Sequence, residues 1–138
     1  MYDENLVKPM REELTSLGFL ELKNPEQVDQ ELKDFSGCTL VVVNSVCGCA
    51  AGACRPAVKL ALTTSEKKPA KLTTVFAGQD QEATAQARSY FTGYKPSSPA
   101  IALIKDGKIA AMIERTDIEG RSASDIAEEL KQHFSELC

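Results

Sequence analysis

The most apolar run of the chain covers residues 40–43, four consecutive aliphatic positions, three of them β-branched valines. Such a run is typical of a strand that is covered on both faces in a parallel or mixed sheet. The chain then becomes small and helix-permissive from Ala50 to Leu62. The pattern predicts a buried central strand over residues 38–44, followed through a short loop by a helix that ends near Thr63.

Two helices are predicted before this strand. Pro9 is expected to open the first one, which ends before Gly18. The second is expected to begin with Asn24 as its N-cap and Pro25 at its first helical position, and Gln27 is placed for a capping box. This helix is expected to end at residues 36–37.

One strand, a helix, a two-stranded hairpin and a last helix complete the predicted order. Residues 72–77 are rich in β-forming residues, and Asp80 is placed to cap the helix that follows. Asp106-Gly107 lies between the apolar runs 100–105 and 108–113, which is a strong signal for a tight hairpin. Ser122 or Ser124 is placed to cap a last helix whose Ile126 and Phe134 share one face.

This order predicts an α/β fold with a central four-stranded mixed sheet. Strands joined through a helix run parallel by a right-handed crossover, while the hairpin adds two antiparallel strands. The helices then lie on both faces of the sheet, with the two N-terminal helices as additions. A length of 138 residues with 43% apolar content suits one core, so we expect a single domain over residues 1–138.

Composition narrows the classes of partner. The formal net charge is −4, both signs are mixed along the chain, and there is no basic block. Nucleic acid and anionic membrane surfaces are therefore poor partners. No stretch approaches the roughly 20 apolar residues that cross a bilayer, and the N-terminal residues contain no apolar core of a signal peptide. We expect a cytoplasmic protein.

Five cysteines stand at positions 38, 47, 49, 54 and 138. In a cytoplasmic protein this content argues against a structural disulfide framework and for redox or metal chemistry. Cys38 is expected to be a core residue, and Cys138 an exposed residue without a role. Cys54 is expected to be a buried structural cysteine, because along a helix it lies too far from Cys47 and Cys49 for a disulfide.

The sequence Cys47-Gly48-Cys49 is the main candidate for chemistry. These residues are predicted at or just inside a helix N-terminus, where unpaired N–H groups and the helix dipole favour an anion. A thiolate placed there has a pKa well below the value of about 8.5 for a free cysteine. Cys47 lies nearer the loop and is the expected nucleophile, while the more enclosed Cys49 is the expected resolving thiol.

The residues around this pair have plainer expected roles. Asn44 and Ser45 can cap the helix or hydrogen-bond the thiolate, and capping is the expected role of both. Arg55 can add positive charge near the pair, but a solvated side chain is expected. Pro56, inside the predicted helix, is expected to kink it.

Several long blocks of this sequence resemble the bacilliredoxin family. The resemblance covers nearly the whole chain, with one departure, because Cys54 stands where a small residue other than cysteine is expected. The blocks are Val41-Val-Val-Asn-Ser-Val-Cys-Gly-Cys-Ala-Ala-Gly52 with Arg55-Pro56, Thr74-Val-Phe-Ala-Gly-Gln-Asp80 followed by Glu82-Ala-Thr84, and Tyr90-Phe-Thr-Gly93 leading to Pro96-Ser-Ser-Pro99.

The resemblance implies a thioredoxin-like fold and the reduction of mixed disulfides between cytosolic proteins and bacillithiol, a low-molecular-weight thiol that acts as co-substrate. It also implies Cys47 as nucleophile, Cys49 as resolving thiol, and Pro99 as a cis-proline that turns the backbone of Ser98 toward Cys47 to bind substrate. No further cofactor is implied. Two other functions stay open on the residues alone: a weak general disulfide isomerase or reductase, and a metal-binding protein that uses the two cysteines.

Overall fold

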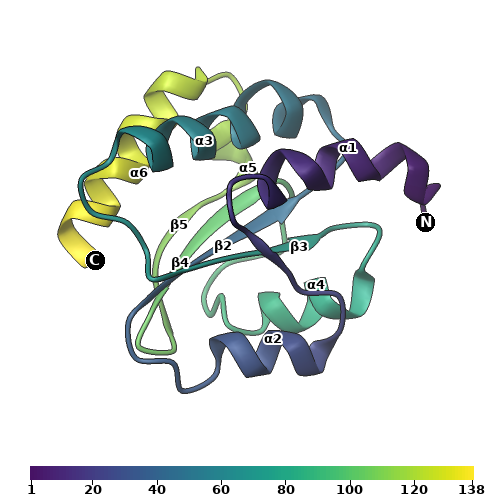
Figure 1. Cartoon of the computed structure of the whole chain (residues 1–138), viewed down its shortest axis with the longest axis horizontal. Coiled ribbons are helices and arrows are strands. Elements are labelled where there is room, and N and C mark those ends of the chain that lie inside the picture. The colour runs from purple at the N-terminus through teal and green to yellow at the C-terminus, as the bar shows by residue number, and fades with distance from the viewer.

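A five-stranded sheet forms the centre of the computed structural model, which describes residues 1–138 (Figure 1). The strand order is β1-β3-β2-β4-β5. β2 is parallel to β3 on one side and antiparallel to β4 on the other, so the sheet is mixed as predicted. The strands are β1 (Leu20–Glu21), β2 (Cys38–Asn44), β3 (Lys71–Phe76), β4 (Ala100–Lys105) and β5 (Lys108–Ile113).

The prediction of four strands was wrong by one edge strand. β1 has only two residues and pairs in parallel with β3, Leu20 with Thr73 and Glu21 with Thr74. A two-residue strand shows no hydrophobic period, so its pairing is decided by the neighbouring strand rather than by its own sequence.

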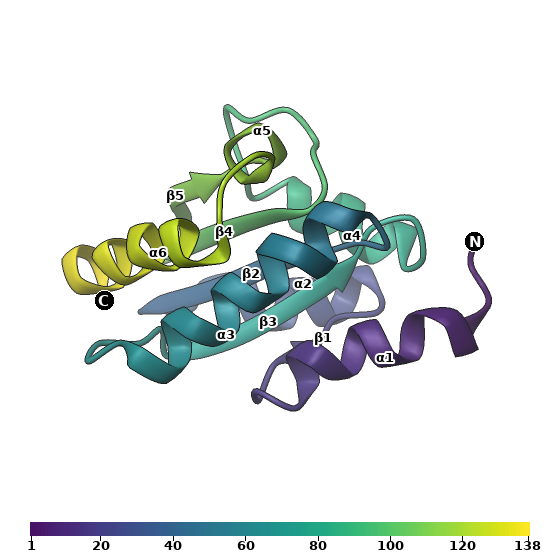
Figure 2. The same ribbon diagram turned by 90° about the horizontal axis from the view of Figure 1, so that it is seen from above.

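Helices cover both faces of the sheet (Figures 1 and 2). The helix pair α3 and α6 packs on one face, with α1 beside α3, and the pair α2 and α4 packs on the other. The helices are α1 (Glu4–Thr15), α2 (Pro25–Leu32), α3 (Arg55–Thr64), α4 (Gln81–Arg88), α5 (Arg115–Ile118) and α6 (Ala123–Leu137), and a short π-helix, η1 (Ala50–Cys54), precedes α3. Every helix falls short of the length and hydrophobicity that a bilayer crossing demands.

The central strand β2 is buried over its whole length, which confirms the prediction from its apolar run. Its side chains alternate between two cores: Leu40 and Val42 pack with α3 and α6, whereas Val41 and Val43 pack with α2 and α4. Two cores of 19 and 13 buried residues therefore share one strand, and the ends of that strand are fixed by packing on both sides.

The cap signals at Asn24 and Ser122 and the turn signal at Asp106-Gly107 are confirmed, whereas Asp80 makes no cap hydrogen bond with its side chain, which pairs with Arg11 instead. The Asn24 side chain accepts a hydrogen bond from the backbone N–H of Gln27 at 2.9 Å, and Ser122 accepts one from Asp125 at 3.1 Å. Asp106 and Gly107 both have positive φ, at 52° and 80°, as the tight turn between β4 and β5 requires.

The first helix begins earlier than predicted. Asp3 caps α1 at Glu4, so Pro9 lies inside the helix instead of opening it. The Asp3 carboxylate accepts a hydrogen bond from the N–H of Asn5 at 2.9 Å and fixes the start one and a half turns before the proline.

A buried arginine attaches α1 to the sheet. The Arg11 side chain is only 9% exposed and forms ion pairs with Glu4 (2.7 Å), Asp80 (2.8 Å) and Glu21 (3.3 Å). Its guanidinium also lies 5.2 Å from the centre of the Phe76 ring. One cation thus joins α1, β1 and the residue before α4, three segments that no shared apolar cluster connects directly.

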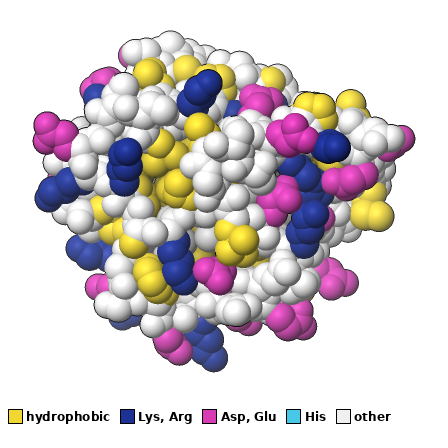
Figure 3. Space-filling model, viewed as in Figure 1, with side chains coloured by type: hydrophobic (Ala, Val, Ile, Leu, Met, Phe, Trp, Pro, Cys, Tyr) yellow, Lys and Arg dark blue, Asp and Glu magenta, His cyan; other side chains and the backbone are white.

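Figure 3 shows positive and negative side chains interspersed over one face of the molecule. Most of the remaining charge pairs are in partial contact with solvent, as in the pair of Arg121 with Glu129, whose side chains are 33% and 34% exposed. Exposed pairs of this kind contribute little to stability because water screens them.

Replacement of Arg11 by methionine is expected to lower the free energy of unfolding by about 3–5 kcal/mol, because three carboxylates lose their shared partner. Urea unfolding measures this loss, and Arg121→Met, expected to cost less than about 1 kcal/mol, is the matched control.

Hydrogen bonds from Arg11 and Gln79 lower the pKa of Glu4 below its ordinary value of 4.5. The Glu4 contribution is therefore present above pH 4.5 and lost as the pH falls through the lower folded value, so the difference between wild type and variant narrows in acid. Equal losses of unfolding free energy for Arg11→Met and Arg121→Met would contradict the role assigned to Arg11.

Candidate active site

The two predicted redox cysteines lie just beyond the C-terminal end of β2. Ser45, the first residue after the strand, is almost fully buried. Cys47 and Cys49 are half-buried, and Gly48 between them is exposed. This end of β2 faces the start of the helical segment that leads into α3. The structure therefore places both thiols at a strand-to-helix junction, with access to solvent.

The helical turn begins at Cys47. Its carbonyl oxygen accepts hydrogen bonds from the backbone N–H groups of Ala50 at 3.1 Å and Ala51 at 3.3 Å. The expected uninterrupted α-helix is wrong, however, because residues 50–54 form the π-helix η1 before α3 begins. Pro56 has no N–H to donate to the carbonyl four residues earlier, and a widened turn beside it is the distortion that the proline was expected to cause.

The environment of Cys47 favours its thiolate. Partial burial opposes ionisation, but a hydrogen bond from the Ser45 hydroxyl, backbone N–H groups of Ala50 and Cys49, and the charge of Arg115 outweigh it, so the pKa of Cys47 lies below its ordinary value. Ser45 also accepts a hydrogen bond from the backbone N–H of Cys47 at 3.2 Å. The Ser45 side chain thus contacts both the backbone N–H and the thiol of Cys47, while no side chain forms a cap hydrogen bond at the start of η1.

The Asn44 side chain forms hydrogen bonds that hold the start of the loop after β2. Its side-chain oxygen accepts hydrogen bonds from the N–H of Ser45 and from Arg55, both at 2.9 Å, and its amide nitrogen donates to the carbonyl of Met10 at 3.2 Å. It therefore fixes the strand end and does not contact the thiol. Its expected role as a helix cap is wrong, because its side chain bonds to no N–H of the helix.

Arg55 is buried, which overturns the expectation of a solvated side chain. It is 3% exposed, donates to the carbonyl of Ser45 at 2.9 Å, and lies 3.2 Å from the carboxylate of Glu13 on α1. The side chain reaches back from the start of α3 across the active-site loop. Helix, loop and α1 are thus connected through one guanidinium.

A second loop closes the site from the side of β4. The peptide bond between Ser98 and Pro99 is cis, as the family resemblance implies. Ala100, the next residue, pairs with Val43 near the end of β2. Because the strands are antiparallel at this point, the start of β4 lies beside the end of the strand that carries the cysteine loop.

Two arginines hold this loop. Arg115, the first residue of α5, donates from its side chain to the carbonyl of Ser98 at 3.0 Å and from its backbone to the hydroxyl of Ser97 at 3.3 Å. Arg88 donates to the carbonyl of Ser97 at 3.2 Å. The sequence analysis missed both arginines. Arg115 follows shortly after the second strand of the hairpin. Because that strand is antiparallel to β4, it ends beside the start of β4, and this position was the available signal that Arg115 lies near the Ser98–Pro99 loop.

Cys54 does not belong to the reactive pair. It is the last residue of η1 and is fully buried, and burial raises the pKa of its thiol to about 12. This confirms the expectation of a buried cysteine. Nowhere does the fold gather three or more histidine, cysteine, aspartate or glutamate side chains in a metal-binding arrangement.

Comparisons with known proteins cover almost the whole chain. A family model described as disulphide isomerase matches residues 2–138. A bacilliredoxin of Geobacillus kaustophilus is 53% identical over 137 residues, which are 99% of this chain and 94% of the relative. A bacilliredoxin of Bacillus cereus is 52% identical over 134 residues, or 97% of this chain and 92% of the relative.

Solved structures share the fold at low sequence identity. A putative oxidoreductase with a thioredoxin fold is 16% identical, with a TM-score of 0.59 over 82% of this chain and 92% of its own. Mitochondrial thioredoxin 3 of Saccharomyces cerevisiae is 15% identical, with a TM-score of 0.56 over 91% and 99%. The thioredoxin-like fold is confirmed. On the identity and coverage of its relatives, the chain belongs to the bacilliredoxin family and is a thiol–disulfide oxidoreductase.

Proposed function

We propose that this protein removes bacillithiol from mixed disulfides on cytosolic proteins, with Cys47 as nucleophile and Cys49 as resolving thiol. The observation that carries the proposal is a half-exposed thiol with a lowered pKa at a helix start, with a second half-buried thiol two residues further on. The names of the relatives support bacillithiol as the thiol that is removed.

The reaction proceeds by two thiol–disulfide exchanges. The Cys47 thiolate attacks the bacillithiol sulfur of the mixed disulfide, and the thiolate of the substrate protein leaves and takes up a proton. Bacillithiol is then bound to Cys47. The Cys49 thiolate attacks the Cys47 sulfur, which releases bacillithiol and leaves a Cys47–Cys49 disulfide. In the alternative route, the thiolate of a second bacillithiol attacks the bound bacillithiol sulfur, which releases the Cys47 thiolate and forms bacillithiol disulfide.

The lowered pKa of Cys47 serves the first exchange and the later reduction of the Cys47–Cys49 disulfide. A larger thiolate fraction near neutral pH speeds the attack on the substrate, and a stabilised thiolate is a good leaving group when the Cys47–Cys49 disulfide is later reduced. The hydrogen bond from Ser45 and the charge of Arg115 are the side-chain contributions to this shift. Gly48 adds no side chain between the two sulfurs and leaves the approach open.

The loop before β4 supplies the substrate edge in this proposal. Arg115 engages the Ser98 carbonyl, while the Ser98 N–H has no acceptor within the chain. An extended segment of a substrate protein can accept this N–H and lie along the loop beside Pro99, with its mixed disulfide at Cys47.

The family model's description favours a second function for the same dithiol. A disulphide isomerase uses the first exchange only, and the nucleophile is then released by a thiol of the substrate itself. Recovery of activity from a scrambled disulfide protein, with no bacillithiol present, measures this function directly.

The rate of alkylation of Cys47 by iodoacetamide is expected to rise with pH and level off with a midpoint below the ordinary thiol value of about 8.5. Ser45→Ala and Arg115→Gln are each expected to move the midpoint upward, because each removes one stabilising contact to the thiolate. Arg121→Gln is the control, and Cys54 should stay unlabelled until the protein is unfolded. A wild-type midpoint at the ordinary value would contradict the nucleophile assignment.

Cys49→Ala is expected to accumulate bacillithiol on Cys47 when it is mixed with a bacillithiolated protein, because the resolving step is lost. Cys47→Ala is expected to accumulate none, and Cys54→Ala should behave like the wild type. Intact-mass measurement under non-reducing conditions detects the adduct. Equal trapping by the first two variants would reject the assigned roles.

One test protein carrying either bacillithiol or glutathione on the same cysteine tests the substrate. De-thiolation of the bacillithiol adduct is expected to be about tenfold faster, which corresponds to roughly 1.4 kcal/mol of differential transition-state binding. Release of the free test protein, followed by mass spectrometry, measures both rates. Equal rates would favour a general reductase.

A further inference from the structure

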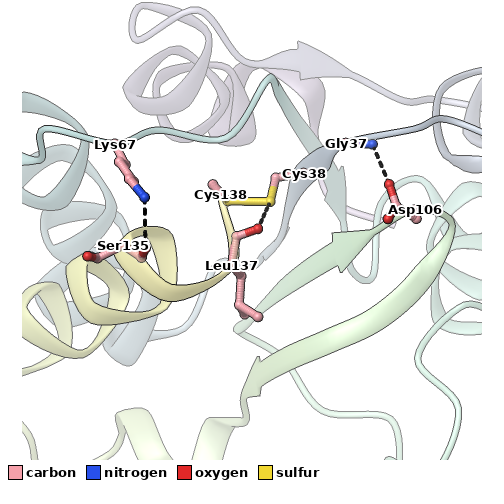
Figure 4. The surroundings of a disulfide bond; sticks show 7 residues. All are labelled: Gly37, Cys38, Lys67, Asp106, Ser135, Leu137 and Cys138. Atoms are coloured by element: carbon pink, nitrogen blue, oxygen red, sulfur yellow. Dashed lines mark hydrogen bonds between the residues drawn. A yellow bond between two sulfur atoms is a disulfide. The ribbon is translucent and has the colours of Figure 1, made fainter.

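A second pair of cysteines lies at the opposite end of the molecule. Cys38, the first residue of β2, and Cys138, the last residue of the chain, form a disulfide across 100 residues, with their Cα atoms 5.7 Å apart (Figure 4). The expectation that Cys138 has no role is therefore wrong, as is the expectation of no structural disulfide. Cys38 is buried, as expected, whereas Cys138 is exposed at the end of α6.

This pair is separated from the active site by the length of the central strand. β2 spans seven residues, and at about 3.3 Å per residue its ends lie about 20 Å apart. Cys47 follows one end and Cys38 begins the other. Exchange between the two pairs within one molecule is therefore excluded by distance, and the buried Cys54 offers no relay.

The surroundings of Cys38 suit both the oxidised and the reduced state. Its sulfur lies 3.0 Å from the carbonyl oxygen of Leu137, an acceptor for the thiol S–H once the disulfide is opened. The strand start is held independently, because the N–H of Gly37 donates to the Asp106 side chain at 2.8 Å (Figure 4). Reduction thus leaves a buried thiol with a hydrogen-bond partner and a fixed backbone.

The helix that carries Cys138 is anchored before its last turn. Ile126, Leu130 and Phe134 of α6 are buried against the sheet and α3. The last turn has fewer attachments: apart from Cys138 and Leu137, Lys67 donates to the carbonyl of Ser135 at 3.3 Å from an exposed position (Figure 4). Opening the disulfide therefore releases this turn without removing the core of α6.

We propose that Cys38 and Cys138 form a second thiol–disulfide couple, independent of Cys47 and Cys49, which reacts with low-molecular-weight disulfides and fastens the end of α6 when oxidised. The Cys138 thiolate attacks a disulfide RSSR, forms Cys138–S–S–R and releases one RS⁻. The Cys38 thiolate then attacks the Cys138 sulfur, closes the intrachain disulfide and releases the second RS⁻. The dithiol loses two electrons and two protons, RSSR becomes two RSH, and excess thiol reverses both steps.

Helix polarity distinguishes this couple from the active-site pair. Cys138 follows the C-terminal end of α6, where the negative end of the helix dipole disfavours a thiolate. Cys47 occupies the opposite kind of site, at a helix start. Because its reduced form is less favoured, the second couple exchanges more slowly and stays oxidised in more reducing buffers than the active-site pair.

Titration in buffers of reduced and oxidised glutathione, followed by alkylation and intact-mass measurement, tests the couple. The double variant Cys47→Ser/Cys49→Ser is expected to lose two alkylatable thiols in one transition, with a peptide that links residues 38 and 138. The wild type is expected to show a second transition, in which the active-site pair oxidises only at a ratio of oxidised to reduced thiol at least tenfold higher. Stable glutathione on Cys138 with Cys38 still free, or no linkage without the active-site cysteines, would overturn the proposal.

Hydrogen exchange tests the fastening of α6. Reduction of the double variant is expected to speed exchange of the amides of residues 136–138 at least tenfold, while residues 126–130 stay protected. Cys138→Ser in the same background should show no dependence on the redox buffer. Unchanged exchange at the helix end would refute the fastening. None of these measurements uses de-thiolation activity, so failure of this proposal can be distinguished from failure of the proposed function.

Discussion

Burial of β2 on both faces is the constraint on which the arrangement of this protein depends. A strand packed between two cores cannot slip or tilt without exposing apolar side chains, so its two ends are fixed points. The loop with Cys47 and Cys49 continues from one end, and Cys38 begins the other. Both cysteine pairs therefore take their positions from the same strand, and that strand also keeps them apart.

The thiols of this chain illustrate how position alone changes one functional group. Cys47 lies at a helix start with a hydroxyl and N–H donors around its sulfur, and its pKa is lowered. Cys54, seven residues later, is enclosed by apolar side chains, and its pKa is raised to about 12. Cys138 follows the end of a helix and is joined to a buried partner. Reactivity follows from the electric field and solvent access at each sulfur, since the side chain is identical.

Features that depend on neighbours along the chain could be predicted before the fold was known. The hairpin turn at Asp106-Gly107, the Asn24 cap and the burial of β2 follow from local backbone preference and hydrophobic period. The placement of Cys47 and Cys49 at a helix start is of the same kind, because the strand, the short loop and the small helical residues are consecutive.

Contacts between residues far apart in the chain could not be predicted in this way. Arg55 is buried because Asn44 and Glu13 converge on it from a strand and another helix, and Arg115 reaches the Ser98 carbonyl through the pairing of β4 with β5. The two-residue strand β1 and the partnership of Cys38 with Cys138 arise in the same way. Local sequence does not predict such contacts, because their interaction energy arises only after packing has brought the two segments together.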